Sequence, residues 1–400
     1  MLFDKIKKAE KDPILGLTEE FKKDDNVNKV NLSVGVYQDE FGNTPTFSTV
    51  LDAERQIQIQ EISKTYKPID GDKQFIDRSI GLVFGGQLST EKEGLLFGLN
   101  TPGGTGALRL ASDFLHKFSN ESSVWISDPS WPNHKPIFES SGFNVNNYSY
   151  FDSSTNSVGF DDMVSDIKSV PSGDIIVLHG CCHNPTGSDL NYNQWEEIAD
   201  LIANKGLVTI CDFAYQGLGD GIDEDATGVR VLSEKLDELI VCSSYSKNFG
   251  LYSERVGCLF YHSRNKSISE SVLSQLKKTA RSNYSNPPAH GSEIVKLILG
   301  DKVLRKEWIE ELTQVRERII SVRKMFVEKL NERKSVKDFN FIQAQKGMFS
   351  FTGLTPPQVD LLKRDYSIYI VNSGRINIAG INSNNVDYLA DSIADSIKKI

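Results

Sequence analysis

Short apolar runs separated by a helical pattern dominate the middle of the chain. The runs cover residues 174–178, 207–211, 239–243 and 256–261, and a helical pattern covers residues 192–204 between the first two. Near-continuous apolar strands are typical of a sheet that is covered on both faces, and intervening helices favour parallel crossovers. The pattern predicts an α/β layered structure whose ligand crevice lies beyond the carboxyl ends of the strands.

The last third of the chain follows a different pattern. Apolar residues recur every three or four positions from Leu304 to Leu330, which favours a long amphipathic helix over a coiled coil. Residues 339–341 and 348–351 have the pattern of strands, and the spacing within residues 386–397 predicts a closing helix. We expect these segments to form a smaller second domain, which residues 30–37 complete.

The overall composition is that of a globular protein and disfavours two classes of partner. With 400 residues, 39% hydrophobic and 25% charged, the chain is long enough for two or three domains. The net charge of −9 repels nucleic acid and anionic lipid in the absence of a basic patch. The apolar runs are far shorter than the roughly 20 residues that cross a bilayer. We therefore expect neither nucleic acid nor membrane as a partner.

The cysteines and the N-terminus favour the cytoplasm. The five cysteines lie between Cys181 and Cys258, are odd in number and sit mostly in apolar surroundings. We expect buried, reduced thiols rather than disulfides or a metal site. The first residues have no apolar signal core, and Asp4 and Glu10 spoil a transit-peptide pattern.

A glycine-rich turn, Thr101-Pro-Gly-Gly-Thr-Gly-Ala107, precedes residues with helical spacing. Free N–H groups in the first turn of a helix can bind an anion such as phosphate. The turn lacks the P-loop motif and the full dinucleotide motif, so a plain turn before a helix is the competing interpretation.

Polar residues follow three of the apolar runs. A lysine in a crevice, such as Lys247, can lose its proton through desolvation and attack a carbonyl to form a Schiff base. Asp212 either faces a cation, such as a protonated pyridine nitrogen, or caps a helix. Asn184 lies at the same sheet edge in the turn 184–187, and the histidines and cysteines before it do not have zinc-site spacing.

Together, Asn184, Asp212 and Lys247 occupy the strand ends of three successive α/β units, downstream of a phosphate-type turn. This combination indicates a phosphorylated aldehyde cofactor.

The same residues lie in motifs that resemble one enzyme family. The chain resembles the pyridoxal-phosphate-dependent aminotransferases of fold type I, in the aspartate aminotransferase group, across nearly its whole length. The matching segments are DPILGL, NLSVGVY, TPGGTGALR, DPSWPNHK, HGCCHNPTG, DFAYQG, SSYSKNFGLYSERVG, RSNYSNPPAHG, GMFSF and SGRINIAG.

The resemblance implies a fold and an assembly. The fold would be a mainly parallel seven-stranded sheet sandwiched by helices, with a smaller α/β domain. Residues 46–311 would form the large cofactor-binding domain, residues 15–45 and 312–400 the small domain, and residues 1–14 an N-terminal arm. The assembly would be a homodimer with shared active sites.

The resemblance also implies roles for single residues. Lys247 would bind pyridoxal 5'-phosphate covalently and shuttle a proton, with Asp212, Tyr215 and Trp131 as its catalytic companions. The residues around the cofactor would be Gly104, Thr105, Trp131, Asn184, Asp212, Tyr215, Ser244, Ser246, Lys247 and Arg255, with Tyr66 from the neighbouring subunit. Gly35, Trp131, Asn184, Arg281 and Arg375 would bind the substrate, and no metal would be needed.

Two arginines set the implied substrate, because a guanidinium binds a carboxylate through two parallel hydrogen bonds. Arg375 would hold the α-carboxylate, and Arg281 would reach the distal carboxylate across the dimer interface. The implied reaction is a ping-pong transamination from L-aspartate to 2-oxoglutarate. Thr65 and Lys67 beside Tyr66, and Gln38, depart from the residues that relatives often carry.

Other interpretations remain open at this point. An aromatic aminotransferase of the same group shares both arginines, and a β-lyase uses the same scaffold. A non-catalytic protein that retains the fold would have lost Lys247 or Asp212. A nicotinamide dehydrogenase would use the glycine-rich turn but leave Lys247 and Asp212 without a role.

Overall fold

The computed structural model describes residues 3–8, 14–60, 63–333 and 337–400. Part of the predicted N-terminal arm, residues 1–2 and 9–13, lies outside this set, and so does the start of the DPILGL motif.

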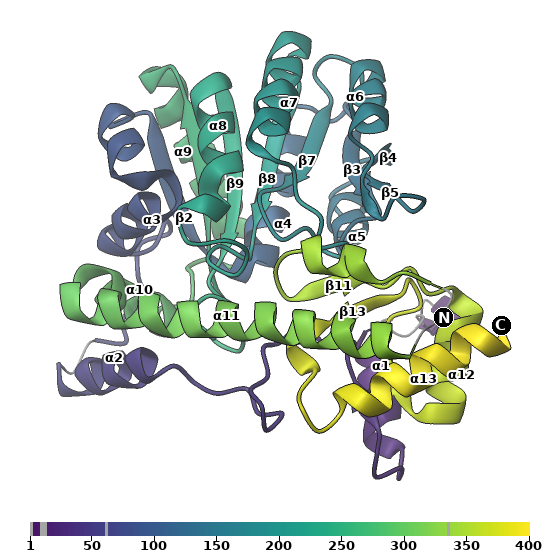
Figure 1. Cartoon of the computed structure of the whole chain (residues 1–400). Coiled ribbons are helices and arrows are strands. Elements are labelled where there is room, and N and C mark those ends of the chain that lie inside the picture. Colours follow the sequence, from purple (N-terminus) through teal and green to yellow (C-terminus); the bar gives the residue numbers. More distant parts are fainter. Residues whose placement is uncertain (1–2, 9–13, 61–62, 334–336) are drawn as a thin grey trace.

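A seven-stranded sheet forms the centre of the structure, with the strand order β2-β10-β9-β8-β7-β3-β4 (Figure 1). The strands are β2 (Leu96–Pro102), β3 (Val124–Asp128), β4 (Val145–Ser149), β7 (Ile175–His179), β8 (Val208–Phe213), β9 (Glu238–Ser244) and β10 (Val256–Ser263). Neighbouring strands are parallel except at β10, which is antiparallel to both β9 and β2. The mainly parallel α/β sheet is confirmed.

The expectation of parallel crossovers between all the apolar runs is wrong at β10. Residues 245–255 join β9 to β10 through turns without a helix. A parallel return needs a crossover of a dozen or more residues, usually with a helix, so this short connection brings β10 back antiparallel. As a result, the start of β10 lies at the same sheet edge as the ends of the parallel strands.

Helices cover both faces of the sheet, and the apolar runs are continuous for that reason. On β7, Ile175 and Val177 pack into the core on one face, while Ile176 and Leu178 pack into the core on the other. One face is covered by α4 (Gly103–His116), α5 (His134–Glu139) and α9 (Lys266–Asn283), and the other by α3 (Lys73–Glu91), α6 (Phe160–Ser169), α7 (Tyr192–Lys205) and α8 (Thr227–Lys235). The short strands β5 (Phe151–Asp152) and β6 (Ser157–Val158) form a separate hairpin.

The predicted long helix is confirmed as α11 (Lys302–Glu332), which crosses the molecule below the sheet in Figure 1. Its buried side is the predicted apolar stripe, including Trp308, Leu312, Ile319 and Phe326. Two further helices, α2 (Ser48–Ile59) and α10 (His290–Gly300), lie beside its first half.

The N-terminal and C-terminal segments pack together, as expected. β1 (Val30–Asn31) pairs parallel with β12 (Ile368–Tyr369), and β11 (Phe349–Phe351) pairs antiparallel with β13 (Arg375–Asn377). The helices of this part are α1 (Leu15–Lys23), α12 (Pro356–Tyr366) and the predicted closing helix α13 (Val386–Lys399). The exact domain boundaries stay a prediction.

The strand expected at residues 339–341 is wrong. The chain there forms the 3₁₀ helix η3 (Asn340–Ala344). Phe339 and Ile342 are both fully buried, and their spacing of three residues matches one 3₁₀ turn, which places both side chains on the same side. The other 3₁₀ turns are η1 (Phe3–Lys5), η2 (Glu224–Ala226) and η4 (Ile378–Gly380).

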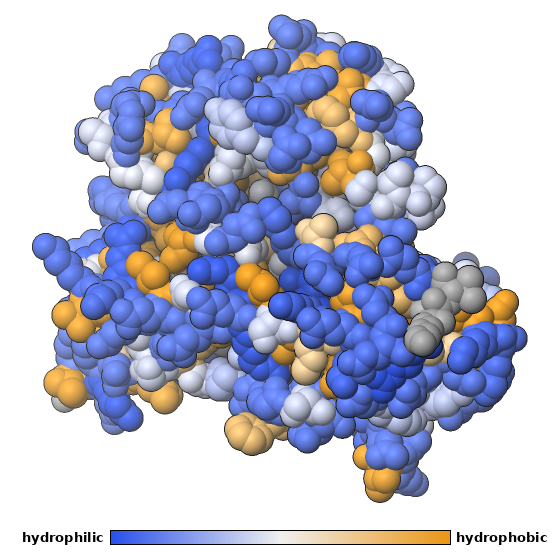
Figure 2. Space-filling view, in the orientation of Figure 1, coloured by the Kyte–Doolittle hydropathy of each residue, from blue (hydrophilic) through white to orange (hydrophobic). Residues whose placement is uncertain are grey.

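The surface and the cysteines agree with the composition. The face in Figure 2 is mostly hydrophilic, with hydrophobic residues in small separate spots.

All five cysteines are free and buried, which confirms the expectation of buried thiols. Within the described residues, no helix is both long enough and apolar enough to span a bilayer.

Candidate functional site

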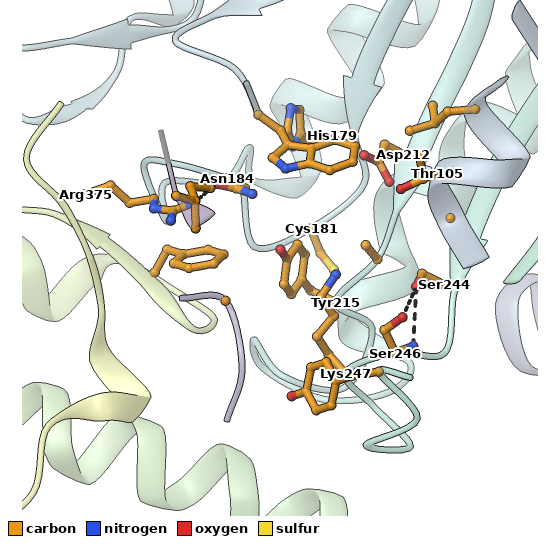
Figure 3. A pocket seen from close by; sticks show the side chains of 18 of the residues that line it. Thr105, His179, Cys181, Asn184, Asp212, Tyr215, Ser244, Ser246, Lys247 and Arg375 are labelled. Atoms are coloured by element: carbon orange, nitrogen blue, oxygen red, sulfur yellow. Dashed lines mark hydrogen bonds between the residues drawn. The ribbon is translucent and has the colours of Figure 1, made fainter. Parts of the chain in front are cut away.

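The candidate site is a cavity of about 270 Å³ at the sheet edge where the parallel strands end and β10 begins. The ends of β2, β3, β7, β8 and β9 each lead directly into segments that line it, and the C-terminal part of the chain closes one side (Figure 3). The lining residues are Ile14, Gly35, Gly104, Thr105, Leu108, Trp131, His179, Cys181, Asn184, Asp212, Ala214, Tyr215, Ser244, Ser246, Lys247, Tyr252, Arg255, Phe349 and Arg375.

Lys247 lies in the cavity wall, three residues after β9 ends at Ser244. Its Nζ is 4.7 Å from the centre of the Tyr215 ring. Burial lowers the pKa of Lys247 to about 8, although the Asp212 carboxylate opposes that shift. The neutral amine, which is the nucleophilic form, is therefore far more populated at neutral pH than in an ordinary lysine.

Asp212 is the second-last residue of β8 and does not cap a helix. Its Oδ2 is 2.9 Å from Nε2 of the fully buried His134. Burial alone would raise the pKa of Asp212, but His134, together with His179 and Lys247, outweighs burial and holds the pKa below its usual range. Asp212 thus presents a negative charge to the cavity.

His134 was missed by the sequence reasoning, although it lies in the DPSWPNHK motif. It is the first residue of α5, and its Nδ1 is 2.9 Å from the Ser130 hydroxyl, which is also 3.3 Å from His179 Nε2. The signal for it in the sequence is the run Val124–Asp128, which forms β3 and whose end leads to His134 at this edge.

An anion-binding cradle lies at the start of α4. Gly103 has φ +74°, and a Cβ there would lie 2.5 Å from Arg255 Nη2, so the position requires glycine. Gly104 and Thr105, in the first turn of α4, line the cavity, and N–H groups in the first turn of a helix can bind an anion. Arg255 Nη1 donates to Ser246 Oγ at 3.3 Å, and Ser244 Oγ donates to the same oxygen at 3.1 Å.

Arg375 lies at the opposite end of the cavity and is 2% exposed (Figure 3). Its Nη1 donates to Asn184 Oδ1 at 3.2 Å and its Nη2 to the Ser33 carbonyl at 2.6 Å, while Nε is buried without a partner in the described structure. The guanidinium stacks 4.3 Å from the centre of the Phe349 ring. Burial lowers the pKa of Arg375 to about 10, and a buried cation held only by neutral oxygens favours an anionic ligand.

The remaining predicted residues line the space between these two ends. Tyr215 and Trp131 lie in the cavity wall, and the Trp131 ring packs edge-on against His134 at 5.3 Å. A Cβ at Gly35 would lie 2.9 Å from the Phe349 ring, so glycine lets the N-terminal segment close over this side. The cavity can therefore hold a flat ring with an anionic group at one end and a second anion at Arg375.

Comparisons of the whole sequence with known proteins identify its family. The family described as "Aminotransferase class I and II" matches residues 27–393. The chain belongs to this family.

Individual relatives match over almost the entire chain. An aspartate aminotransferase of Haemophilus influenzae is 45% identical, over 98% of this chain and 99% of that protein. The solved structure of an aromatic-amino-acid aminotransferase from Burkholderia pseudomallei, covalently bound to pyridoxal phosphate, has a TM-score of 0.96 and 43% identity, and the alignment covers 99% of this chain and 100% of that one. Aspartate aminotransferase from Saccharomyces cerevisiae cytoplasm has a TM-score of 0.97 and 36% identity, with 100% and 99% coverage.

Two residues predicted from the aminotransferase motifs lie outside the cavity of the single chain. Tyr66 is 91% exposed, and Arg281, near the end of α9, is exposed as well. Arg281 Nη1 donates to Ser285 Oγ and, at 3.3 Å, to Asn286 Oδ1. The structure brings together all the predicted site residues of this aminotransferase except these two.

Among the described residues, one group of side chains that could bind a metal ion adjoins the cavity, and its Cys181 also lines the cavity. Ligand atoms of Cys181, Cys182 and Asp225 lie within 4.8 Å of one another. Asp225 accepts hydrogen bonds from the backbone N–H groups of residues 217, 219 and 220. The hydrogen bond with Cys181 lowers the pKa of Cys182, but burial and nearby carboxylates outweigh it and raise the pKa to about 12. Burial also raises the pKa of Asp225 to about 6, so at neutral pH the group consists of protonated thiols beside a carboxylate held by backbone N–H groups.

Proposed function

We propose that the protein is a pyridoxal-phosphate-dependent aspartate aminotransferase. It transfers the amino group of L-aspartate to the cofactor, releases oxaloacetate, and then transfers that group to 2-oxoglutarate to form L-glutamate. The main evidence for an aminotransferase site is the buried Arg375. It lacks a carboxylate partner in the described structure and shares one cavity with Lys247, whose pKa is lowered.

The cavity fits pyridoxal phosphate group by group. Gly104, Thr105, Ser244, Ser246 and Arg255 would hold the phosphate. Asp212 would keep the ring nitrogen protonated, Asn184 and Tyr215 would donate to the ring hydroxyl oxygen, and Trp131 would pack on the ring. When bound, the cofactor supplies an aldehyde that links to an amine and a ring that withdraws electrons from the substrate Cα.

The protein's own residues supply binding, orientation and proton transfer. Arg375 binds the α-carboxylate through two parallel hydrogen bonds and so fixes the orientation of the Cα–H bond. Lys247 would hold the cofactor through its amine, and its Nζ would accept and move the proton at the substrate Cα. Asp212 keeps its charge through His134 and stabilises positive charge on the ring side of the cavity.

The proposal includes a homodimer with shared sites. Tyr66 would reach the phosphate in the second subunit, and Arg281 would bind the distal carboxylate of the substrate there. Tyr66 is exposed together with Leu51 and Ile59 of α2, and Figure 2 shows hydrophobic spots over this part of the molecule. In such a dimer, a second copy would cover these apolar side chains of the helix that precedes Tyr66 in the sequence. The five buried free thiols favour the cytoplasm.

Transamination assays test the proposal directly. The purified protein with pyridoxal phosphate should convert L-aspartate and 2-oxoglutarate to oxaloacetate and L-glutamate, and Lys247→Ala should abolish turnover while the protein still binds the cofactor. Near-normal turnover by Lys247→Ala would refute the role of that lysine.

An aromatic aminotransferase is the second candidate, because the structure from Burkholderia pseudomallei carries that name. Both candidates use Arg375, so only the donor separates them. We expect kcat/KM to be higher for L-aspartate than for L-phenylalanine. The opposite order would replace aspartate by an aromatic substrate and leave the reaction class unchanged.

A further inference from the structure

A cluster of four charged side chains lies directly beside Tyr66. We call it the Lys67 clamp: Lys67 from the loop 63–72, Asp72 at the end of that loop, and Glu293 and Lys296 from α10. Its two positive and two negative charges balance. Lys67 and Lys296 are 20% and 14% exposed in their side chains, and Glu293 is 3% exposed.

Glu293 is the centre of the Lys67 clamp. One of its carboxylate oxygens contacts Lys67 Nζ and the other contacts Lys296 Nζ. Asp72 Oδ2 lies 3.2 Å from Lys296 Nζ and 3.6 Å from Lys67 Nζ. Burial disfavours the charged form of Lys67, but Glu293 and Asp72 outweigh it and raise the pKa of Lys67. Lys67 is therefore charged and held between α10 and the start of α3.

The backbone of the same loop is held at two further points. The Lys67 carbonyl accepts a hydrogen bond from Asn286 Nδ2 at 2.7 Å, and Asn286 Oδ1 in turn accepts from Arg281. Asp70 forms an ion pair with Lys277 of α9 at 2.6 Å. The two residues that lie outside the cavity of their own chain, Tyr66 and Arg281, are thus connected through one amide.

We propose that the Lys67 clamp is a positioning device, which fixes the Tyr66 loop in the geometry that a second copy of the chain requires. This inference rests on the proposed function, in which Tyr66 serves the cofactor phosphate of the other subunit. Tyr66 is 91% exposed and lies in a loop without regular structure, so its own chain provides little side-chain packing to hold it. Ordering that loop before association reduces the entropy lost when the shared site forms.

A half-buried charge cluster around a buried carboxylate suits such a positioning role better than a general stabilising one. Buried ion pairs add little net stability relative to apolar residues of similar size, because desolvation offsets their attraction. Their directional contacts do fix one geometry. Lys67 adjoins Tyr66 in sequence, so anchoring its side chain and its carbonyl restricts the backbone that carries the tyrosine.

A double-mutant cycle on the dimeric protein tests this proposal. The four proteins are the parent, Lys67→Met, Tyr66→Phe and the double variant, and the measured quantity is the dissociation constant of pyridoxal phosphate from the apoprotein. Lys67→Met leaves Glu293 paired with Lys296, so the buried carboxylate keeps a cation. Lys67→Arg should keep the affinity of the parent, and Lys73→Met, which breaks the exposed pair with Asp77 on α3, is the matched control.

We expect Lys67→Met alone to weaken cofactor binding about tenfold, and less than about twofold when Tyr66 is already Phe. Pyridoxal, which has no phosphate, should bind the parent and Lys67→Met equally. If Lys67→Met does not yield folded dimer, Glu293→Gln takes its place in the cycle with the same expectation.

Equal losses in the two Tyr66 backgrounds would overturn the positioning role and leave the proposed function intact. A Tyr66→Phe variant that binds the cofactor as tightly as the parent would instead refute the shared phosphate site, and with it the basis of the inference.

Discussion

At the scale of single residues, the site consists of charges that burial has shifted or left without a counterion. Lys247 loses proton affinity through burial, while Asp212 keeps its negative charge because His134 lies 2.9 Å away. Arg375 is buried against neutral oxygens. Burying each of these groups without a ligand costs free energy. Each gains a partner when a phosphorylated pyridine aldehyde and an amino acid bind.

The pKa of Lys247 leads to a prediction about cofactor capture. Only the neutral amine attacks an aldehyde, so the rate at which apoprotein binds pyridoxal phosphate should rise with pH and level off above about 8, the pKa of Lys247. Stopped-flow absorbance across a pH series measures this rate. An inflection near 10.5, the usual value for lysine, would contradict the effect of burial.

The charge of Asp212 leads to a second prediction. Asp212→Asn keeps the shape of the side chain and removes the charge, so kcat should fall about 100- to 1,000-fold. Asp174→Asn is the matched control, because Asp174 precedes β7 at the opposite edge and accepts hydrogen bonds from Ser123 and Trp125. The control should keep kcat within about twofold. Comparable losses in both variants would mean that the effect is structural.

At the scale of elements, α11 connects the site to the rest of the molecule. Trp308 stacks on Phe249 at 4.4 Å, and its Nε1 donates to the Asn248 carbonyl at 2.8 Å. Arg316 donates to the Gly217 carbonyl at 3.2 Å. One face of this helix therefore supports both the loop of Lys247 and the loop of Tyr215.

Replacing the buried Trp308 of α11 by alanine should lower the stability of the protein. Trp308 is fully buried, so Trp308→Ala should lower the free energy of unfolding by about 3–5 kcal/mol. Ile320 of the same helix is 50% exposed, and Ile320→Ala should change it by less than about 0.5 kcal/mol. Denaturant unfolding followed by fluorescence and circular dichroism measures both. A loss in Trp308→Ala no larger than in Ile320→Ala would show that the packing is not tight there.

The sequence was informative about elements whose periodicity is set by burial. The apolar runs predicted β7, β8 and β9, and the stripe from Leu304 to Leu330 predicted α11. It was uninformative where a tertiary contact decides the structure. The antiparallel direction of β10 follows from a short connection, and η3 replaced a predicted strand because Phe339 and Ile342 share one buried side.

The site residues likewise divide into those that the sequence could predict and those that it could not. Residues that follow strand ends, such as Asn184, Asp212 and Lys247, could be found because parallel strands end at one edge. His134 could not be found this way, because the strand before it was not recognised and its contact with Asp212 joins residues far apart in the sequence. Tyr66 and Arg281 lie outside the cavity of their own chain, and the roles proposed for them need a second chain.

At the scale of the whole molecule, the proposed active site needs two chains. Lys247, Asp212 and Arg375 lie in the cavity of one chain, whereas Tyr66 and Arg281 are exposed on its surface. A closed two-fold dimer lets each chain complete the site of the other. Dimer formation would then be a condition for activity on dicarboxylic substrates.

Mixing two inactive variants tests this arrangement. Lys247→Ala and Arg281→Asp homodimers should each be nearly inactive on L-aspartate. After random subunit exchange, half of the dimers are mixed and each has one intact site, so about a quarter of the parent activity should return. An Arg281→Asp chain mixed with the parent chain serves as the control for exchange. No recovery after verified exchange would show that Arg281 acts within its own subunit.

The most direct measurement of the central claim is a single turnover with L-aspartate and no oxo acid acceptor. Protein loaded with pyridoxal phosphate should release one oxaloacetate per chain and lose its visible cofactor absorption at the same rate, while Lys247→Ala, loaded equally, should release none on that timescale. Equal release by both proteins, or a fully loaded parent that leaves L-aspartate unchanged, would contradict the account.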